Sequence, residues 1–229
     1  MPTCRGPLRS KGLPPHTSPS RYFGSHAYRD DLSPPTRPVT AQSPDDHVVF
    51  SHTIEVLFRK VLAPRITPAI EAKMKAVGVD LSKPLDPAYP LRVFDAAMEV
   101  VAVEGMSHLE KHDALRKIGE LQVDSFMQTF LGKATFQFLK LLSRERFVTR
   151  LTNSWRQANN FIETQISSAP DGSLTLRLND VGRFPEVIEG VLFAGFKAAG
   201  HDVVIETGAR EGLGCDYRVR FLRDTRGAS

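Results

Sequence analysis

The apolar pattern is strongest between Phe184 and Phe221, where it predicts one helix followed by two strands. The segment Phe184 to Gly200 has a proline near its start and a glycine at its end, as helices often do. Apolar residues cover most of the circumference of this helix, so other elements must cover it on nearly all sides. The alternating segments Val203 to Glu206 and Tyr217 to Phe221 predict half-buried strands, joined around Gly208 to Gly214.

A second pair of strands is predicted just before that helix. Phe161 to Ile166 and Leu174 to Leu178 flank Pro170-Asp171-Gly172-Ser173, a turn sequence whose glycine tolerates a positive φ. Because hairpin strands pair antiparallel, residues 159–222 are predicted to form an antiparallel sheet in the order strand-strand-helix-strand-strand.

Residues 47–158 have helical periodicity instead. Val48-Val49-Phe50 predicts a short strand or an extended lead-in, and the proline-rich stretch Asp80 to Pro90 predicts a loop or an extended crossing. Thr67 is the expected N-cap of the second helix, and Ser107-His108-Leu109-Glu110 has the spacing of a capping box that begins the fourth. The predicted helices are 51–63, 68–77, 91–103, 107–130 with a break, 133–142 and 144–157. The fold class is therefore α+β, with an N-terminal helical layer packed on an antiparallel sheet.

The segment 1–46 differs from the rest of the chain because it holds nine prolines and has no periodicity. Such a segment cannot bury enough apolar area to offset the entropy lost on ordering, so it is predicted to be a disordered Pro-rich tail. A polyproline ligand, a flexible tether, or translation starting near Val48 are the alternatives. One domain is predicted over 47–224, with a helical part at 51–158 and a sheet-and-helix part at 159–222.

Charge and cysteine usage narrow the class of protein. The net charge is +4, and half of it lies in residues 1–46, so the body of the chain is nearly balanced and no nucleic-acid partner is expected. Cys4 and Cys215 are the only cysteines, which favours a reducing compartment. The sequence has no apolar run of about 18 residues and no apolar signal-peptide region. We expect a cytoplasmic protein with no membrane span.

A series of short blocks occurs in an order that resembles one family. The blocks are Val49-Phe50, Glu55-Val56-Leu57-Phe58-Arg59, Gly78-Val79-Asp80-Leu81, Pro84-Leu85, Tyr89-Pro90, Ala114-Leu115-Arg116-Lys117-Ile118-Gly119, Thr129-Phe130-Leu131-Gly132, Arg150, Asn159-Asn160-Phe161, Gly190, Gly200 and Tyr217-Arg218-Val219. Over about 47–222 this order resembles the uncharacterised paralogous family of roughly 200-residue proteins expanded in myxobacteria, a domain-of-unknown-function family. The resemblance implies a bacterial cytoplasmic protein present in many copies, and it implies no activity.

A more distant resemblance is to four-vinyl-reductase-like domains and to the small subunits of the TRAPP tethering complex. These folds also place helices before a sheet-and-helix half that ends in a glycine-rich hairpin, and Gly212-Leu213-Gly214-Cys215-Asp216-Tyr217 is similar to that ending. The resemblance implies a small-molecule or lipid-binding sensor, or a dimeric scaffold.

The candidate metal ligands are His108 and His112, which are four residues apart at the predicted start of a helix. Glu104 or Glu110 could add an oxygen ligand. Leu109 stands where a metalloprotease motif has its general-base glutamate, so that motif is excluded. The alternative interpretation is a pair of solvated histidines.

Large aromatic side chains are concentrated where the helical part meets the sheet. Five of them are predicted to line a pocket for an apolar or planar ligand at this helix–sheet junction: Phe130, Phe138, Trp155, Phe161 and Phe193. The alternative is that they form a filled core.

Arg146 and Arg150 share a helix face that could receive a phosphate group or an acidic partner, although a solvated face has the same pattern. Cys215 fits a small buried residue. The sequence contains no nucleophile-elbow, Walker A or dinucleotide-binding motif and assigns no cofactor.

No acid, base and nucleophile converge in the sequence, so an enzyme is not favoured. The first hypothesis is a non-catalytic regulatory or sensor domain that binds a small apolar ligand at the helix–sheet junction. The alternative is a homodimeric protein-interaction scaffold that pairs through an apolar face of the helical half.

Overall fold

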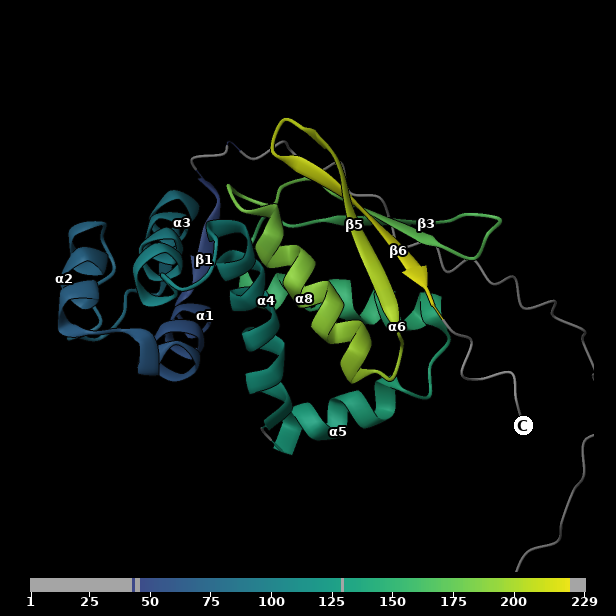
Figure 1. The fold of residues 1–229 in the computed structure, drawn as a ribbon, viewed down its shortest axis with the longest axis horizontal. Coiled ribbons are helices and arrows are strands. Elements are labelled where there is room, and N and C mark those ends of the chain that lie inside the picture. Colours follow the sequence, from purple (N-terminus) through teal and green to yellow (C-terminus); the bar gives the residue numbers. More distant parts are fainter. Residues whose placement is uncertain (1–42, 44–45, 129, 223–229) are drawn as a thin grey trace, which may run out of the picture. The chain divides into compact units, whose positions relative to one another are not determined.

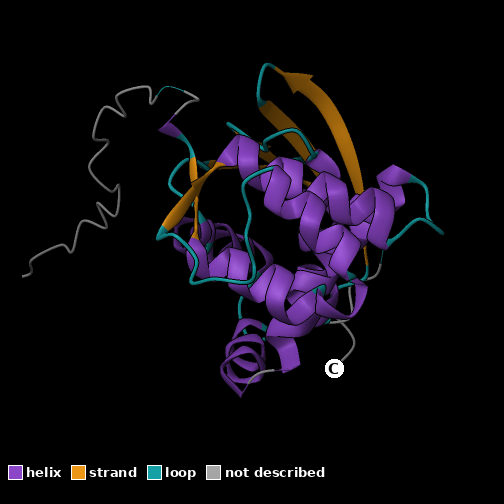
Figure 2. Cartoon of the chain, turned by 90° about the vertical axis from the view of Figure 1, so that its left-hand side faces the viewer, coloured by secondary structure: helices purple, strands orange, loops and turns teal. Residues whose placement is uncertain are grey.

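The structure is a computed structural model that describes residues 43, 46–128 and 130–222. The predicted Pro-rich tail, 1–46, lies outside the described residues except for Ser43 and Asp46. The described chain is α+β, with helices and two antiparallel sheets, which confirms the predicted fold class. Figure 1 shows the order of the elements, and Figure 2 shows the two sheets lying apart with helices between them.

The smaller sheet pairs β1 (Val48–Phe50) with β2 (Ala88–Pro90). The extended lead-in was predicted, and the prediction of a loop or an extended crossing over 80–90 agrees with the structure, in which β2 forms at the end of this stretch. Proline cannot donate a hydrogen bond to a strand, but it is tolerated at a strand end in a sheet of two strands. The buried Tyr89 ring at the centre of β2 explains why this short strand is held in place.

The helices of the N-terminal part contain wide and tight turns as well as regular α-helix. They are α1 (Ser51–Ile54), which continues as the π-helical η2 (Glu55–Val61), the 3-10 turn η3 (Ala63–Arg65), α2 (Pro68–Ala76), and α3 (Leu91–Val100), which continues as the π-helical η4 (Val101–Gly105). The predicted N-cap is confirmed, since the Thr67 hydroxyl oxygen accepts a hydrogen bond from the Ile70 N–H at 3.3 Å.

Four further helices lead to the C-terminal sheet: α4 (Lys111–Gln128), α5 (Phe130–Leu139), α6 (Arg144–Asn153) and α7 (Trp155–Ala158). The predicted capping box at Ser107 was wrong, because residues 107–110 form a turn and α4 begins after it. In that turn the Leu109 N–H donates to the Met106 carbonyl at 2.9 Å, and the Leu109 side chain packs against the core. Packing of Leu109 has overridden the local capping pattern.

The larger sheet contains β3 (Thr164–Ser168), β4 (Leu174–Leu178), β5 (Val203–Glu211) and β6 (Gly214–Phe221). Its order is β3-β4-β6-β5, and every neighbouring pair is antiparallel, as predicted. The second hairpin is longer than predicted. Its turn is short because Gly212, with φ +61°, reverses the chain immediately before β6.

The buried helix predicted from the sequence is α8 (Pro185–Ala198), and it lies against one face of this sheet (Figure 1). Most of its apolar side chains are buried, among them Val187, Ile188, Val191 and Leu192. The sheet residues alternate: Leu176, Tyr217 and Val219 are fully buried, whereas Arg177, Arg218 and Arg220 are exposed. The Tyr217 hydroxyl donates a hydrogen bond to the Pro185 carbonyl at 2.9 Å and so ties the sheet to the start of α8.

The α4 and α8 helices cross with direct backbone contact (Figure 1). A Cβ atom added at Gly190 would lie 2.0 Å from the Arg116 carbonyl oxygen, and one added at Gly119 would lie 2.0 Å from the Val187 carbonyl oxygen. Only glycine fits at both positions. This crossing fixes the helical part against the sheet-and-helix part.

Among the described residues, no helix combines the length and the apolar character that a membrane-spanning helix requires.

Candidate functional site

A partly open cavity of about 80 Å³, lined mainly by buried residues, lies at the junction between the helical part and the sheet-and-helix part. It is lined by residues of β1, α1, α3, α4, α7 and α8 and of the segments on either side of β3 and β4. Most of its wall is apolar, and Phe94, Met98, Phe161, Ile162, Ile188 and Val191 are examples. A concave, mainly apolar space with a few polar groups is the usual form of a small-molecule site.

Trp155 is the most informative residue of the cavity wall. Only 9% of its surface is exposed, and it is the only tryptophan in the chain. Within the described part of the chain its indole Nε1 has no hydrogen-bond partner. A buried N–H donor without a partner is costly, so such groups call for an explanation.

Asp95 contributes a carboxyl group to the same wall, although only 3% of its surface is exposed. Its Oδ2 atom accepts a hydrogen bond from the Arg183 backbone N–H at 3.0 Å. Burial raises the pKa of Asp95 to about 6, because removing a carboxylate from water disfavours its charged form; the hydrogen bond from Arg183 only partly opposes this. Asp95 is therefore a polar group whose charge changes just below neutral pH.

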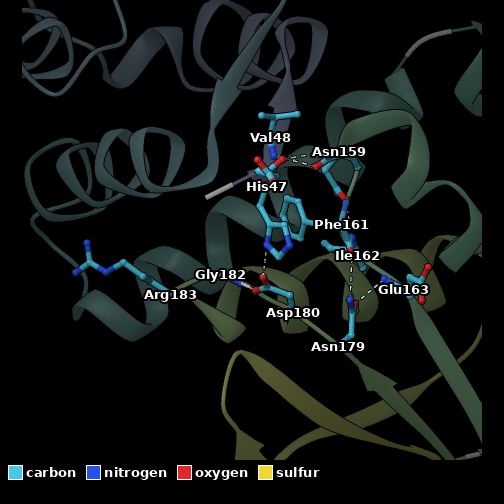
Figure 3. Close-up of polar contacts among 12 residues, drawn as sticks. His47, Val48, Asn159, Phe161, Ile162, Glu163, Asn179, Asp180, Gly182 and Arg183 are labelled. Carbon is cyan, nitrogen blue, oxygen red and sulfur yellow. Dashed lines mark hydrogen bonds and ion pairs between the residues drawn. The ribbon is translucent and has the colours of Figure 1, made fainter. Parts of the chain in front are cut away.

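The segment 179–184, which we call the junction loop, connects β4 to α8 and contacts several elements at once (Figure 3). Asn179 accepts a hydrogen bond from the Glu163 N–H at 2.6 Å and donates one to the Phe161 carbonyl at 2.9 Å. The Val181 N–H donates to the Leu213 carbonyl in the β5–β6 turn at 3.0 Å, and the Val181 side chain lines the cavity. The loop therefore joins the cavity to the far hairpin.

The junction loop also binds the N-terminal part through a buried pair. His47 Nδ1 lies 2.7 Å from Asp180 Oδ2, and both side chains are buried. The His47 ring stacks on Phe161 with 4.9 Å between ring centroids (Figure 3). Asp180 Oδ1 accepts the Gly182 N–H at 2.7 Å, which holds the loop in its turn. At Gly182, φ is +63° and a Cβ atom would lie 3.0 Å from Asp95 Oδ2, so glycine is required there.

The two asparagines that precede β3 fix the corner of the cavity. Asn159 Oδ1 accepts hydrogen bonds from the N–H groups of Phe161 and Ile162 at 3.2 and 2.9 Å. Asn160 Oδ1 accepts the Val48 N–H at 2.9 Å, and its amide nitrogen donates to the Asp46 carbonyl at 3.0 Å. These bonds explain why β3 begins later than the predicted Phe161: the first residues after α7 are held in the corner instead of in the sheet.

The structure brings two of the five predicted pocket aromatics, Trp155 and Phe161, into the cavity wall. Phe138 is 54% exposed on α5. Phe193 is half-buried, with the Arg116 guanidinium 4.9 Å and the Lys197 ammonium 5.9 Å from its ring centroid. Phe130 begins α5, and its side chain lies outside the described part.

The two predicted metal ligands lie in different secondary structure, one in a turn and one in a helix. His108 is exposed in the turn before α4, and His112 is exposed in its first turn, where Nδ1 lies 3.4 Å from Asp113 Oδ1. The described residues contain no group of three or more side chains suited to hold a metal ion. Arg146 and Arg150 are both exposed on α6, as the proposed basic face requires.

A second, more open hollow of about 330 Å³ lies at the end of the larger sheet. Its basic side chains are engaged within the protein. Arg220 pairs with Glu206, and the Arg144 guanidinium lies 4.2 Å from the centroid of the Phe221 ring. We therefore take the smaller junction cavity, whose wall is mainly apolar and buried, as the candidate site.

Sequence reasoning missed the polar part of this site, which is formed by His47, Asp95 and Asp180. One signal was present: Asp95 lies next to Phe94 within the apolar face of the predicted helix 91–103. An acidic residue on an apolar face indicates a buried polar group that needs a partner.

The fold and the sequence together place this chain among known proteins. Residues 47–221 match the family described as "Protein of unknown function (DUF2378)", and the chain belongs to this family. This confirms the resemblance to a family of unknown function over almost the whole range given above. A comparison with curated proteins finds no match.

Among solved structures, the chain is similar to H-NOX proteins. A doubly substituted Tt H-NOX has a TM-score of 0.56 at 11% identity, covering 77% of this chain and 97% of that one. An H-NOX protein from S. oneidensis in the Fe(II)NO ligation state has a TM-score of 0.54 at 12% identity, covering 75% and 98%. A structure concerned with heme distortion in the H-NOX family has a TM-score of 0.57 at 9% identity, covering 78% and 97%. At these identities the likeness shows the fold alone.

Proposed function

We propose that this protein is a non-catalytic sensor domain that binds a small ligand in the junction cavity. The observation that carries the proposal is the cavity itself, a mainly apolar space with Trp155 and Asp95 in its wall. The likeness of the fold to H-NOX proteins, whose solved members include an Fe(II)NO ligation state, supports a small ligand.

The junction loop is the element through which occupancy would be transmitted. Val181 lines the cavity, while the neighbouring Asp180 pairs with His47 of the N-terminal part. On its other side the loop is bonded to the β5–β6 hairpin, because Arg210 donates to the Gly182 and Arg183 carbonyls. A ligand that moves Val181 changes contacts to both parts of the domain, which is how binding at a buried site alters an exposed surface.

Haem is the cofactor that the similar structures suggest, since one of them concerns heme distortion. The junction cavity does not fit this group. Its volume of about 80 Å³ is well below the roughly 300–1,000 Å³ of pockets that enclose molecules of drug size. Haem iron also needs an axial His, Cys, Tyr or Met–His ligand set. Met98 lines the cavity, but no described His, Cys or Tyr does.

The described histidines are placed elsewhere. His47 is held by Asp180, and His201 lies among the rings of Phe147, Phe196 and Phe221. Cys215 is buried in β6, and the Tyr217 hydroxyl is bonded to Pro185. We therefore derive no step through haem for this chain.

Xenon binding to the full-length protein tests the proposed function, because xenon enters small apolar cavities. The amide and indole N–H signals are followed by NMR under xenon pressure. We expect the Trp155 indole signal to shift, together with the amides of Asp180 and Gly182 in the junction loop.

Two variants that carry the same substitution, valine to leucine, provide the control. Val191→Leu adds a methylene at the cavity wall, whereas Val123→Leu adds the same group at an equally buried position of α4 that does not line the cavity. The first should weaken the xenon response at least fivefold, and the second should preserve it. If xenon leaves the indole and loop signals unchanged, the proposed function is wrong.

A second candidate function is the homodimeric interaction scaffold. It is favoured by apolar side chains exposed around α5, where Phe138 is 54% and Leu141 is 80% exposed. If this surface pairs two copies, a Phe138→Ser/Leu141→Gln variant should shift a dimer to a monomer in light scattering, while Gln137→Ser on the same helix should not. A monomeric parent protein at 100 μM or so would rule this surface out as a dimer interface.

A further inference from the structure

We infer that the junction cavity binds a small, neutral molecule that carries a hydrogen-bond acceptor, directly on the protein and without haem. The acceptor is held by the Trp155 indole N–H. This inference rests on the proposed function and names the chemical class of the ligand.

The size of the ligand follows from the volume of the site and from the fixed side chains around it. A space of about 80 Å³ admits a molecule of only a few non-hydrogen atoms. The side chains around it are held from several directions. Phe161 is stacked on His47, and the corner before it is fixed by Asn159. Expansion to a much larger ligand would have to break these contacts.

The acceptor follows from the unpartnered donor. Of the buried side-chain polar atoms without a hydrogen-bond partner in the described chain, Trp155 Nε1 is the one that belongs to a residue lining the cavity. The indole nitrogen can only donate a hydrogen bond. A ligand that accepts this bond removes the cost of the buried N–H, and one that cannot accept it leaves the cost in place.

Three other polar groups of the wall are already engaged. The Thr53 hydroxyl donates to the Ala158 carbonyl at 3.3 Å, Asn159 Oδ1 serves two backbone N–H groups, and Asp95 Oδ2 accepts from Arg183. Gln122 adds a half-buried carboxamide. Trp155 is therefore the buried donor of the wall that lacks a partner, and it selects for an acceptor.

The charge of the ligand follows from its neighbours. An anion would face the Asp95 carboxyl, which lines the same wall and carries a negative charge at neutral pH. A cation would leave the indole N–H unpaired and would itself lose its water shell. A neutral molecule avoids both costs.

Acetone and isobutene provide the experimental test, because they have nearly the same shape and only acetone carries an acceptor oxygen. Each is titrated into the full-length ¹⁵N-labelled protein. Since the chain has one tryptophan, the spectrum has one indole N–H signal. We expect acetone to move the indole proton downfield, as a new hydrogen bond does, and isobutene to cause no downfield shift.

The Trp155→Phe variant then separates the hydrogen bond from the packing. It should weaken acetone binding about fivefold, in line with the loss of one net hydrogen bond, while isobutene binding changes less than twofold. Equal losses for the two probes would overturn the acceptor inference but leave the cavity proposal standing.

Haemin supplies the remaining comparison. Added to the full-length protein at equal concentration, it should produce no sharp Soret band and should not displace acetone. A stoichiometric Soret complex that displaces acetone would overturn direct binding while preserving a sensor function. If xenon leaves the indole and loop signals unchanged, the proposed function itself is wrong, and the present inference with it.

Discussion

The α8 helix makes two contrasting kinds of contact within the same domain. At Gly190 it touches the backbone of α4 so closely that even a methyl group has no room. A short distance along the chain, Val187, Ile188 and Val191 border a cavity of about 80 Å³ instead. The comparison shows that loose packing in this protein is local and is not a general property of its core.

The cavity also carries a thermodynamic cost. At about 24 cal/mol per Å³ it corresponds to roughly 2 kcal/mol of lost stability, to which the unpartnered Trp155 N–H adds. Elsewhere the core is filled by large, fully buried side chains such as Phe58, Phe147 and Phe196. Natural proteins depart from good packing mainly at functional sites, which is the reason to assign function to the junction.

The largest expected effect is at the tight crossing. Gly190→Ala should lower the free energy of unfolding by about 3 kcal/mol or more, because its Cβ atom would overlap the Arg116 carbonyl and neither helix backbone can move without disturbing the other. Gly195→Ala on the same helix is the matched control, since its Cβ atom would meet only the Leu151 side chain at 3.2 Å. Denaturant unfolding measures both, and equal effects would contradict the account of the crossing.

Removing the charge of Asp95 should have the next largest effect. The folded protein holds this proton more tightly than the unfolded chain, so the parent protein loses stability relative to Asp95→Asn as the pH rises from about 4 to 6. The difference in unfolding free energy between Asp95→Asn and the parent protein should reach about 3 kcal/mol above pH 6 and vanish near pH 3. Denaturant unfolding across this pH range measures it.

Two other acidic groups give the opposite pH dependence of stability, and they do so in both the parent protein and the Asp95→Asn variant. Hydrogen bonds from the hydroxyls of Ser82 and Ser173 lower the pKa values of Asp80 and Asp171 to about 2, so both stabilise the fold above their ordinary pKa and lose that effect as the pH falls. The contributions of Asp80 and Asp171 cancel in the difference in unfolding free energy between Asp95→Asn and the parent protein. A pH-independent difference would contradict the buried state of Asp95.

Filling the cavity should produce a smaller effect, and it should raise the free energy of unfolding instead of lowering it. Val191→Leu should raise the free energy of unfolding by about 1 kcal/mol, because it fills space without displacing atoms, and Val123→Leu should lower it by about 1 kcal/mol, because it overpacks a filled region. Thermal unfolding distinguishes the two directions. Destabilisation of similar size by both would show that the junction is already filled.

The smallest effect is expected on the outer face of the larger sheet. Arg220 pairs with Glu206 there, with both side chains about half exposed. Arg220→Gln should change the free energy of unfolding by less than about 0.5 kcal/mol, because water and salt screen exposed pairs. A larger loss in denaturant unfolding would mean that this face is less solvated than its alternating pattern indicates.

The sequence was most informative where one physical effect dominates. The apolar circumference of 184–200, the turn at Gly172 and the alternation of β4 follow from burial and backbone sterics, and all three were predicted correctly. Local capping rules were less reliable. They held at Thr67 and failed at Ser107, where core packing of Leu109 outweighs a cap of about 1 kcal/mol.

The site could be predicted only in part. Trp155 and Phe161 were assigned to a ligand pocket because aromatic residues were concentrated near the junction, and both line the cavity. The pairing of His47 with Asp180 joins residues that are far apart in sequence, and no local pattern encodes it. The same holds for the bond between Asp95 and the Arg183 backbone, which depends on the turn at Gly182.

The most direct test of the central claim is an intermolecular nuclear Overhauser experiment on the full-length protein with acetone. If a small neutral acceptor binds in the junction cavity, its methyl protons should show contacts to the Trp155 indole ring and to the methyl groups of Ile188 and Val191, and these contacts should disappear in Val191→Leu. Contacts confined to exposed side chains, or contacts that persist unchanged in Val191→Leu, would contradict it.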